Sequence, residues 1–138
     1  MKHLAYSLTI GLSAASAAHG HHSIAGVYDS SRPMTVAGRV TEFRFVNPHP
    51  ILVIEVDAGT ERQSWQLEMD NRFELADIGM SVETFTVGDQ VVATGSLART
   101  EPQRLYLRRL DRSADGFRYE QVGSRPRVTT QAVTREQE

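Results

Sequence analysis

The 138-residue sequence contains no cysteine. This absence excludes a disulfide framework and any metal site built on thiolates, so packing alone has to stabilise the fold. Beyond the first twenty residues there is also no apolar run of membrane length. We therefore expect a mature protein with one modest hydrophobic core and no transmembrane segment.

The chain is also poor in positive charge. It has 15 basic and 17 acidic residues, and Lys2 is its only lysine. If Lys2 is removed, 14 basic residues face 17 acidic ones, which gives a net charge of −3. Nucleic-acid-binding proteins carry a basic surface, so we do not expect a nucleic-acid partner. One local group of arginines consists of Arg104, Arg108, Arg109 and Arg112. We interpret this group as a solvated strand edge rather than as a phosphate-binding site.

The beginning of the chain has the pattern of a cleavable signal peptide over residues 1–20. A short basic start is followed by apolar and small residues, in a stretch too short to span a bilayer. Cleavage after Ala18 would expose His19, and cleavage after Gly20 would expose His21. The pattern predicts a periplasmic or secreted protein.

Three further segments are expected after the signal peptide. Turn-forming residues predict an extended N-terminal arm over residues 21–33. A β-barrel domain is expected over residues 34–123. Residues 124–138 contain a proline, charges and small polar residues without an apolar period, which predicts a disordered tail.

Five β-strands are expected in the domain. The first begins near Met34, and its apolar phase changes near Phe43, which predicts a bulge or coil that lets one strand serve two sheets. Prolines in the 47–50 turn end this strand. Alternation along the third strand directs Trp65, Leu67 and Met69 inward. The other four strands are expected over residues 51–57, 64–69, 90–97 and 105–110.

One short helix is expected between the third and fourth strands. Asn71 is a suitable N-cap, and Glu74 follows it three residues later as in a capping box. Phe73, Ala76 and Ile78 are spaced for one buried face. The order of elements predicts an all-β fold with one short helix, namely a small OB-like five-stranded β-barrel, with an open β-sandwich as the alternative.

Several short motifs occur together along the chain. They are His21-His22-Ser23, Tyr28-Asp29, Gly38-Arg39-Val40-Thr41-Glu42, Asn47-Pro48-His49, Trp65-Gln66-Leu67-Glu68 and a GDxVxxxG segment over residues 88–95. In combination they resemble a family of small exported bacterial proteins of unknown function. The resemblance implies export and a small β-rich fold, and it implies no activity. That family commonly has Gly-Trp after the helix, where this chain has Gly79-Met80.

Histidines are concentrated at the predicted processed N-terminus. Three of the five histidines are His19, His21 and His22, and His49 lies in the 47–50 turn. A free α-amine beside imidazoles chelates divalent metals, and metal binding deprotonates both groups. The sequence therefore predicts a metal site that draws on these four histidines.

The cleavage site decides the geometry of this predicted site. If His21 is the first residue, its amine and ring bind together, and His22 or His49 completes a T-shaped set of three nitrogens. If His19 is the first residue, its amine, two backbone amides and the imidazole of His21 form a square-planar set. Both sets favour Cu(II) over Zn(II). The alternative is a solvated polar N-terminus with His49 capping its own turn.

No catalytic residue is predicted. Metalloprotease, phosphate-loop and EF-hand patterns do not occur in the sequence, and Ser23 beside His22 has no evident third group to orient it. The alternative to a metal-binding protein is a periplasmic binding module, or an accessory subunit that binds another envelope protein. Barrels of this type bind ligands on their second and third strands, which here would present Gln66, Glu68 and Glu55.

Overall fold

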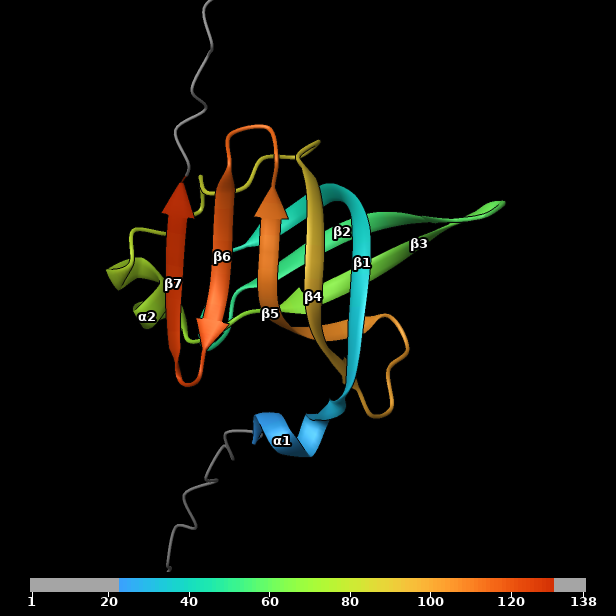
Figure 1. Cartoon of the computed structure of the whole chain (residues 1–138), viewed down its shortest axis with the longest axis horizontal. Coiled ribbons are helices and arrows are strands. Elements are labelled where there is room, and N and C mark those ends of the chain that lie inside the picture. The colour runs from blue at the N-terminus through green and yellow to red at the C-terminus, as the bar shows by residue number, and fades with distance from the viewer. Residues whose placement is uncertain (1–22, 131–138) are drawn as a thin grey trace, which may run out of the picture.

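The computed structural model describes residues 23–130, which form a β-rich structure with two short helices (Figure 1). The prediction of an all-β fold is confirmed, although this part of the chain has two short helices where one was predicted. The helices are α1 (Ile24–Val27) and α2 (Arg72–Asp77). The strands are β1 (Tyr28–Arg44), β2 (Ile51–Ala58), β3 (Glu61–Glu68), β4 (Gln90–Ala98), β5 (Arg104–Arg112), β6 (Phe117–Val122) and β7 (Arg125–Thr130).

The strands pair in the order β3-β2-β1-β4-β5-β6-β7, with neighbours antiparallel. In addition, β3 pairs in parallel with β5, where Leu67 lies opposite Leu105. The pairings of β1 to β5 therefore form a closed cycle, and β6 and β7 extend from β5. Figure 1 shows the β2–β3 hairpin crossing behind the other strands, while β1 bends from one layer into the other.

β1 contributes to both layers because it is long and irregular. Its first part pairs with β4, from Tyr28 opposite Ala98 onward, and its last part pairs with β2. The register with β2 shifts between Val40 and Glu42. This irregularity is the bulge predicted from the change of apolar phase near Phe43, so that prediction is confirmed.

The main hydrophobic core draws side chains from β1 to β6. Leu67 and Met69 are fully buried and Trp65 is nearly so, as their alternation along the chain predicts. Phe117 and Tyr119 enter the same core from β6. The inward face of β3 is thus the one expected.

Helix α2 begins as the sequence predicts. The Asn71 side chain accepts a hydrogen bond from the backbone N–H of Phe73 at 2.8 Å. The predicted buried face is wrong, however, because Leu75 is the buried residue while Phe73 is 62% exposed.

The orientation of α2 is set by its first residue. Arg72 donates from Nε to the carbonyl of Phe45 at 3.1 Å, and its backbone N–H donates to the carbonyl of Pro48 at 3.0 Å. In a helix of six residues these contacts determine which side faces the core. Of the three residues predicted to be buried, Phe73, Ala76 and Ile78, only Ile78 packs against the core.

The ends of the domain differ from the predicted boundaries. Within residues 23–130, seven strands replace the expected five, and α1 together with the start of β1 occupies most of the expected extended arm. The strand β7 lies in the expected disordered tail, because a turn at Gly123, with φ at 63°, folds the chain back onto β6. The predicted signal peptide, residues 1–20, lies outside the described residues, as do residues 21–22 and 131–138.

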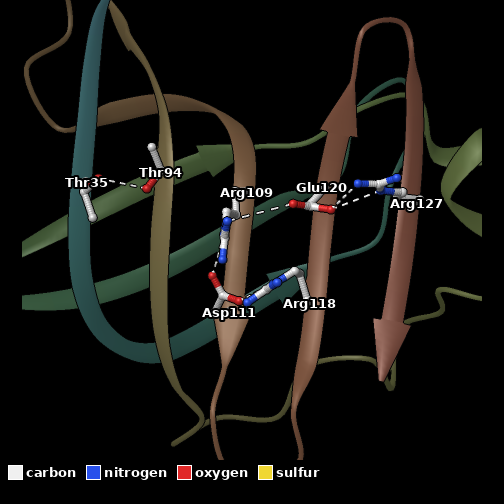
Figure 2. Close-up of polar contacts among 7 residues, drawn as sticks. All are labelled: Thr35, Thr94, Arg109, Asp111, Arg118, Glu120 and Arg127. Carbon is white, nitrogen blue, oxygen red and sulfur yellow. Dashed lines mark hydrogen bonds and ion pairs between the residues drawn. The ribbon is translucent and has the colours of Figure 1, made fainter. Parts of the chain in front are cut away.

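Charged side chains cross one face of β5, β6 and β7 (Figure 2). Arg127 donates to Glu120 at 2.7 Å and 3.0 Å. Arg109 lies 3.9 Å from Glu120 and donates to Asp111 at 2.8 Å, and Arg118 donates to the other oxygen of Asp111 at 2.6 Å. Alternating charges on adjacent strands thus form one network.

The arginine group of β5 is more than a solvated strand edge. Arg109 belongs to the network just described, and Arg108 lies over the ring of Tyr106 at 4.8 Å. Arg104 and Arg112 make specific ion pairs, and their side chains are 28% and 14% exposed. Within β5 itself, Asp111 and Tyr106 are partners of Arg109 and Arg108, whereas the carboxylates that pair with Arg104 and Arg112 come from flanking strands and loops.

Candidate functional site

His49 belongs to the predicted metal set and lies half-buried in the loop between β1 and β2. Backbone hydrogen bonds fix this loop against the end of β3 and the start of α2. Met69 N–H donates to Pro50 at 2.9 Å, and Arg72 N–H donates to Pro48 at 3.0 Å. The Nδ1 atom of His49 lies 3.0 Å from the carbonyl oxygen of Met69.

The contact with Met69 selects the tautomer of His49. A carbonyl oxygen can only accept a hydrogen bond, so Nδ1 is the donor, and in the neutral ring the lone pair is then on Nε2. Metal-binding histidines commonly donate their other ring nitrogen to a carbonyl or carboxylate, which fixes the ring. If His49 binds a metal, Nε2 is therefore the ring nitrogen that would do so.

A polar network lies beside Met69 at the end of β3. The Glu68 carboxylate accepts hydrogen bonds from the hydroxyl of Tyr28 and, at 2.8 Å, from Nη2 of Arg104. Nε of Arg104 donates to the Tyr28 oxygen at 2.8 Å, and its Nη1 donates to Glu101 at 2.7 Å. The Glu68 side chain is 12% exposed. We call Tyr28, Glu68 and Arg104 the latch network.

Strand geometry brings the latch network together. The neighbours of Glu68 on β3 face the core, so Glu68 itself faces the other way. The parallel pairing places Tyr106 of β5 opposite Glu68, and Arg104 is two residues earlier on the same face. Tyr28 is the first residue of β1, which pairs with β4 on the other side of β5.

Burial and charge explain the protonation states in this network. Burial raises the pKa of the Tyr28 phenol well above its usual value, and the hydrogen bond to Glu68 raises it further. Burial opposes the charge on Arg104, but its hydrogen bonds to Glu68 and others outweigh this and raise its pKa. Burial, with the negative charge of Asp70, raises the pKa of Tyr106 to about 12. Both phenols therefore stay protonated.

The segment that precedes β1 packs on the latch network. Ile24 and Val27 of α1 contact a small buried cluster made of Tyr28, Ala98 and Tyr106. The rings of Tyr28 and Tyr106 lie 5.6 Å apart at a tilt of 43°. These contacts hold the first described residues against the face that carries Glu68.

Arg99 adds polar contacts to the same segment. Its backbone N–H donates to the carbonyl of Val27 at 2.9 Å, and its guanidinium lies 3.3 Å from the carbonyl of Ala25 through two nitrogens. Arg99 also lies 3.3 Å from Asp29. We call residues 23–28 the anchor segment.

The residues of the predicted ligand face lie along one face of the β2–β3 hairpin, where Glu55 is opposite Ser64 and Gln66 is opposite Val53. Glu68 is bonded within the latch network, and Gln66 is exposed. Glu55 lies near the middle of the β2–β3 hairpin, where Arg39 and Arg62 donate to it at 2.9 Å and 3.2 Å. Glu55 also lines an open, mixed-charge groove of about 380 Å³ between β1, β2, β4 and β5.

The other predicted metal ligands, His19, His21 and His22, lie outside the described residues. Within residues 23–130, no group of three or more His, Asp or Glu side chains is placed to hold a metal ion. This part of the chain also contains no helix long and apolar enough to cross a membrane.

Reasoning from the sequence missed Tyr28 and Arg104 as members of a site. Both lie far from Glu68 along the chain, at separations of 40 and 36 residues, so local patterns do not connect them. One signal was available, because a carboxylate between inward-facing Leu67 and Met69 needs partners if its face is covered.

The fold and the latch network define a class: a small all-β protein in which the anchor segment is hydrogen-bonded to the end of the β2–β3 hairpin. The chain belongs to a family of unknown function (DUF6152), which matches residues 10–104. The matched range contains the whole latch network and all four predicted metal-binding histidines, whereas β6 and β7 lie beyond it. No curated protein matches the sequence.

Proposed function

We propose that the protein is an exported copper-binding protein that holds one Cu(II) ion at its processed N-terminus. The ligands are the α-amine and imidazole of the first residue, His21, together with an imidazole from His22 or His49. If cleavage falls earlier, His19 supplies the amine and His21 becomes the third residue. Catalysis is not part of the proposal.

One spatial relationship carries this proposal. Tyr28 is bonded to Glu68, and His49 is bonded to the next residue, Met69. Consecutive Cα atoms are about 3.8 Å apart, so β3 holds the anchor segment and the His49 loop at one end of the same strand. The predicted N-terminal histidines directly precede the anchor segment in the sequence.

The orientation of His49 supports its role as a ligand. Its Nδ1 hydrogen bond to a carbonyl leaves Nε2 for a metal, which is the arrangement common around bound metal ions. Nitrogen ligands without thiolate suit Cu(II), which also binds most tightly among the divalent first-row metals. Zn(II) is the weaker candidate, with three nitrogens and water as its ligands.

We also propose that β1 to β5 form an OB-like barrel to which β6 and β7 are added. The closed cycle of pairings, the parallel contact between β3 and β5, and the position of α2 between β3 and β4 support this interpretation. In such a barrel the end of β3 adjoins the loop after β1, where His49 lies.

Intact mass spectrometry of the protein exported by its native host tests the function directly. The expected mass is that of a chain that begins at His21 or at His19. After one equivalent of Cu(II) is added, this mass should increase by that of one tightly held copper ion. A protein that keeps its first twenty residues, or that retains no copper after buffer exchange, contradicts the proposal and leaves a binding module as the better account.

Two altered proteins distinguish the contribution of the N-terminal amine to copper binding from that of the histidine side chains. Acetylating the α-amine of the mature first residue, or replacing His21 with alanine, should weaken Cu(II) binding by about 10-fold or more. His3→Ala is the matched control, because His3 is removed with the signal peptide and the mature protein is unchanged. Equal affinity in all of these proteins would end the metal hypothesis.

A further inference from the structure

An open groove of about 380 Å³ lies where β1 passes from one layer of strands into the other. Arg39 of β1 lines this groove, and it is paired with Glu55 of β2 on one side and with Gln90 of β4 on the other. Figure 1 shows the β2–β3 hairpin extending past β1. Pockets that hold small ligands commonly have volumes of about 300–1,000 Å³, so the groove has room for a small molecule.

Arg39 gives the groove a positive charge with hydrogen-bond donors to spare. Its Nη2 donates to Oε1 of Glu55 at 2.9 Å, which is the one side-chain hydrogen bond of Arg39 within residues 23–130. The Arg39 side chain is 49% exposed. Arg62 donates to the same oxygen of Glu55 at 3.2 Å, so two guanidinium groups share one carboxylate and leave a net positive charge. Because a guanidinium is a planar fork of several N–H donors, Arg39 can still bind a carboxylate.

Asp57 gives the groove a negative charge farther along β2. Its side chain is 87% exposed, and its one ion pair in the described part of the chain is with Arg62. Nε of Arg62 lies 3.6 Å from Oδ1 of Asp57, which is longer than a hydrogen bond. An ammonium group beside Asp57 would therefore gain a charge-assisted hydrogen bond that the protein itself does not supply.

The spacing of these two charges matches a short peptide. Asp57 follows Glu55 by two residues on the same face of β2, and Arg39 lies opposite Glu55. Two residues along a strand span about 7 Å, and the amine and carboxylate of an extended dipeptide are separated by about the same distance. Val92, which is 46% exposed, lies opposite Ala37 in the groove and offers apolar surface to a peptide side chain.

We propose that this groove binds a short peptide of about two residues with free ends. Arg39 holds the carboxylate, Asp57 holds the ammonium group, and Val92 contacts an aliphatic side chain. A bare anion would lie beside Asp57 without a counter-charge of its own, and a bare cation would lie beside Arg39 in the same way. A zwitterion avoids both costs. This site is independent of the proposed copper site, because the groove is lined by neither His49 nor the latch network.

Three matched ligands test the recognition of both ends. The metal-free protein is titrated with alanyl-leucine, with N-acetyl-alanyl-leucine and with alanyl-leucinamide, and binding is followed by the backbone amide resonances of Gln90, Val91 and Val92. Alanyl-leucine should give saturable shifts at these amides. Each modified peptide lacks one charge and should bind about fivefold more weakly or worse. No saturable shift at millimolar alanyl-leucine, or equal affinity for all three ligands, would overturn the proposal.

Two variants assign each end of the peptide to its side chain. Asp57→Asn should weaken binding of alanyl-leucine by about fivefold and leave the affinity for the N-acetyl peptide unchanged. Arg39→Gln should weaken binding of alanyl-leucine to a similar extent and leave the affinity for the amide unchanged. Arg127→Gln is the matched control, because Arg127 is a partly exposed, ion-paired arginine outside the groove (Figure 2).

The control variant should bind alanyl-leucine as the wild type does. If Asp57→Asn and Arg39→Gln affect all three ligands equally, the two side chains do not recognise the two ends, and the proposal is wrong. Because the titrations contain no metal, they give the same answer whether or not the protein binds copper. Loss of the copper function would therefore leave peptide binding in place, and failure of peptide binding would leave the copper function untouched.

Discussion

Asp89 and Arg112 form a partly buried ion pair, with Arg112 Nη1 donating to Asp89 Oδ2 at 2.6 Å. The same carboxylate oxygen accepts from the backbone N–H of Thr86 at 3.0 Å. The Arg112 guanidinium lies 5.5 Å and 5.0 Å from the ring centres of Phe85 and Phe117. The Asp of the GDxVxxxG motif thus ties the turn before β4 to the end of β5.

Replacement of Arg112 should destabilise the fold. Arg112→Met preserves much of the side-chain volume but leaves Asp89 without its cation, and the free energy of unfolding should fall by about 2–4 kcal/mol. Urea denaturation measures this change. Arg62→Met is the control, because the Arg62 side chain is 65% exposed and its ion pair with Glu55 should contribute less than about 1 kcal/mol. Equal effects of the two changes would contradict the role assigned to Arg112.

The inward face of β3 gives a second prediction. Leu67 is fully buried, so Leu67→Ala should lower the free energy of unfolding by about 2–5 kcal/mol through lost burial and a residual cavity. The neighbouring Gln66 is exposed, and Gln66→Ala should change stability by no more than about 0.5 kcal/mol. The opposite ranking in chemical denaturation would mean that the strand faces the other way.

The parts of the fold that could be predicted are those with a local signal. The alternation of Trp65, Leu67 and Met69 predicts the inward face of β3, and Asn71 predicts the start of α2. Alternation of Phe117 and Tyr119 with charged residues was a usable signal for β6. The strand β7 has no such signal, because its formation depends on pairing with β6 through the turn at Gly123.

The latch network could be predicted only in part. The sequence identifies Glu68 as a polar residue on the outward face of β3, but its partners come from the starts of β1 and β5. Tyr28 reaches Glu68 because of the strand order, which brings β1, β4, β5 and β3 side by side. Long-range pairing of this kind leaves no periodic trace near any one of the three residues.

Close backbone contact at Gly95 gives a third prediction. A Cβ atom at this position would overlap the carbonyl oxygen of Tyr106 on β5, and a backbone atom cannot move aside by changing rotamer. Gly95→Ala should therefore destabilise the protein by about 1–3 kcal/mol. Gly26→Ala is the control, since its Cβ would meet only the Cβ of Ser23 at an ordinary 3.9 Å. Thermal unfolding that ranks the two variants equally would contradict this close approach.

The charge network of Figure 2 predicts how stability responds to acid. Hydrogen bonds from Arg109 and Arg118 hold the pKa of Asp111 below its usual value of 3.8, despite an opposing effect of partial burial. Because the folded-state pKa is the lower one, Asp111 stabilises the fold at pH values above the unfolded-state pKa. This contribution is lost as the pH falls from about 4 through the folded-state pKa.

The Asp111→Asn variant should therefore lose less stability than the wild type when urea denaturation at pH 5 is compared with pH 3. Arg109→Gln should reduce the same acid dependence, because it removes the largest cause of the shift. High salt should reduce the difference in acid dependence between Asp111→Asn and the wild type. These side chains are partly exposed, so salt screens their ion pairs. Identical acid dependence of Asp111→Asn and the wild type would show that Arg109 and Arg118 do not stabilise the ionised carboxylate in solution.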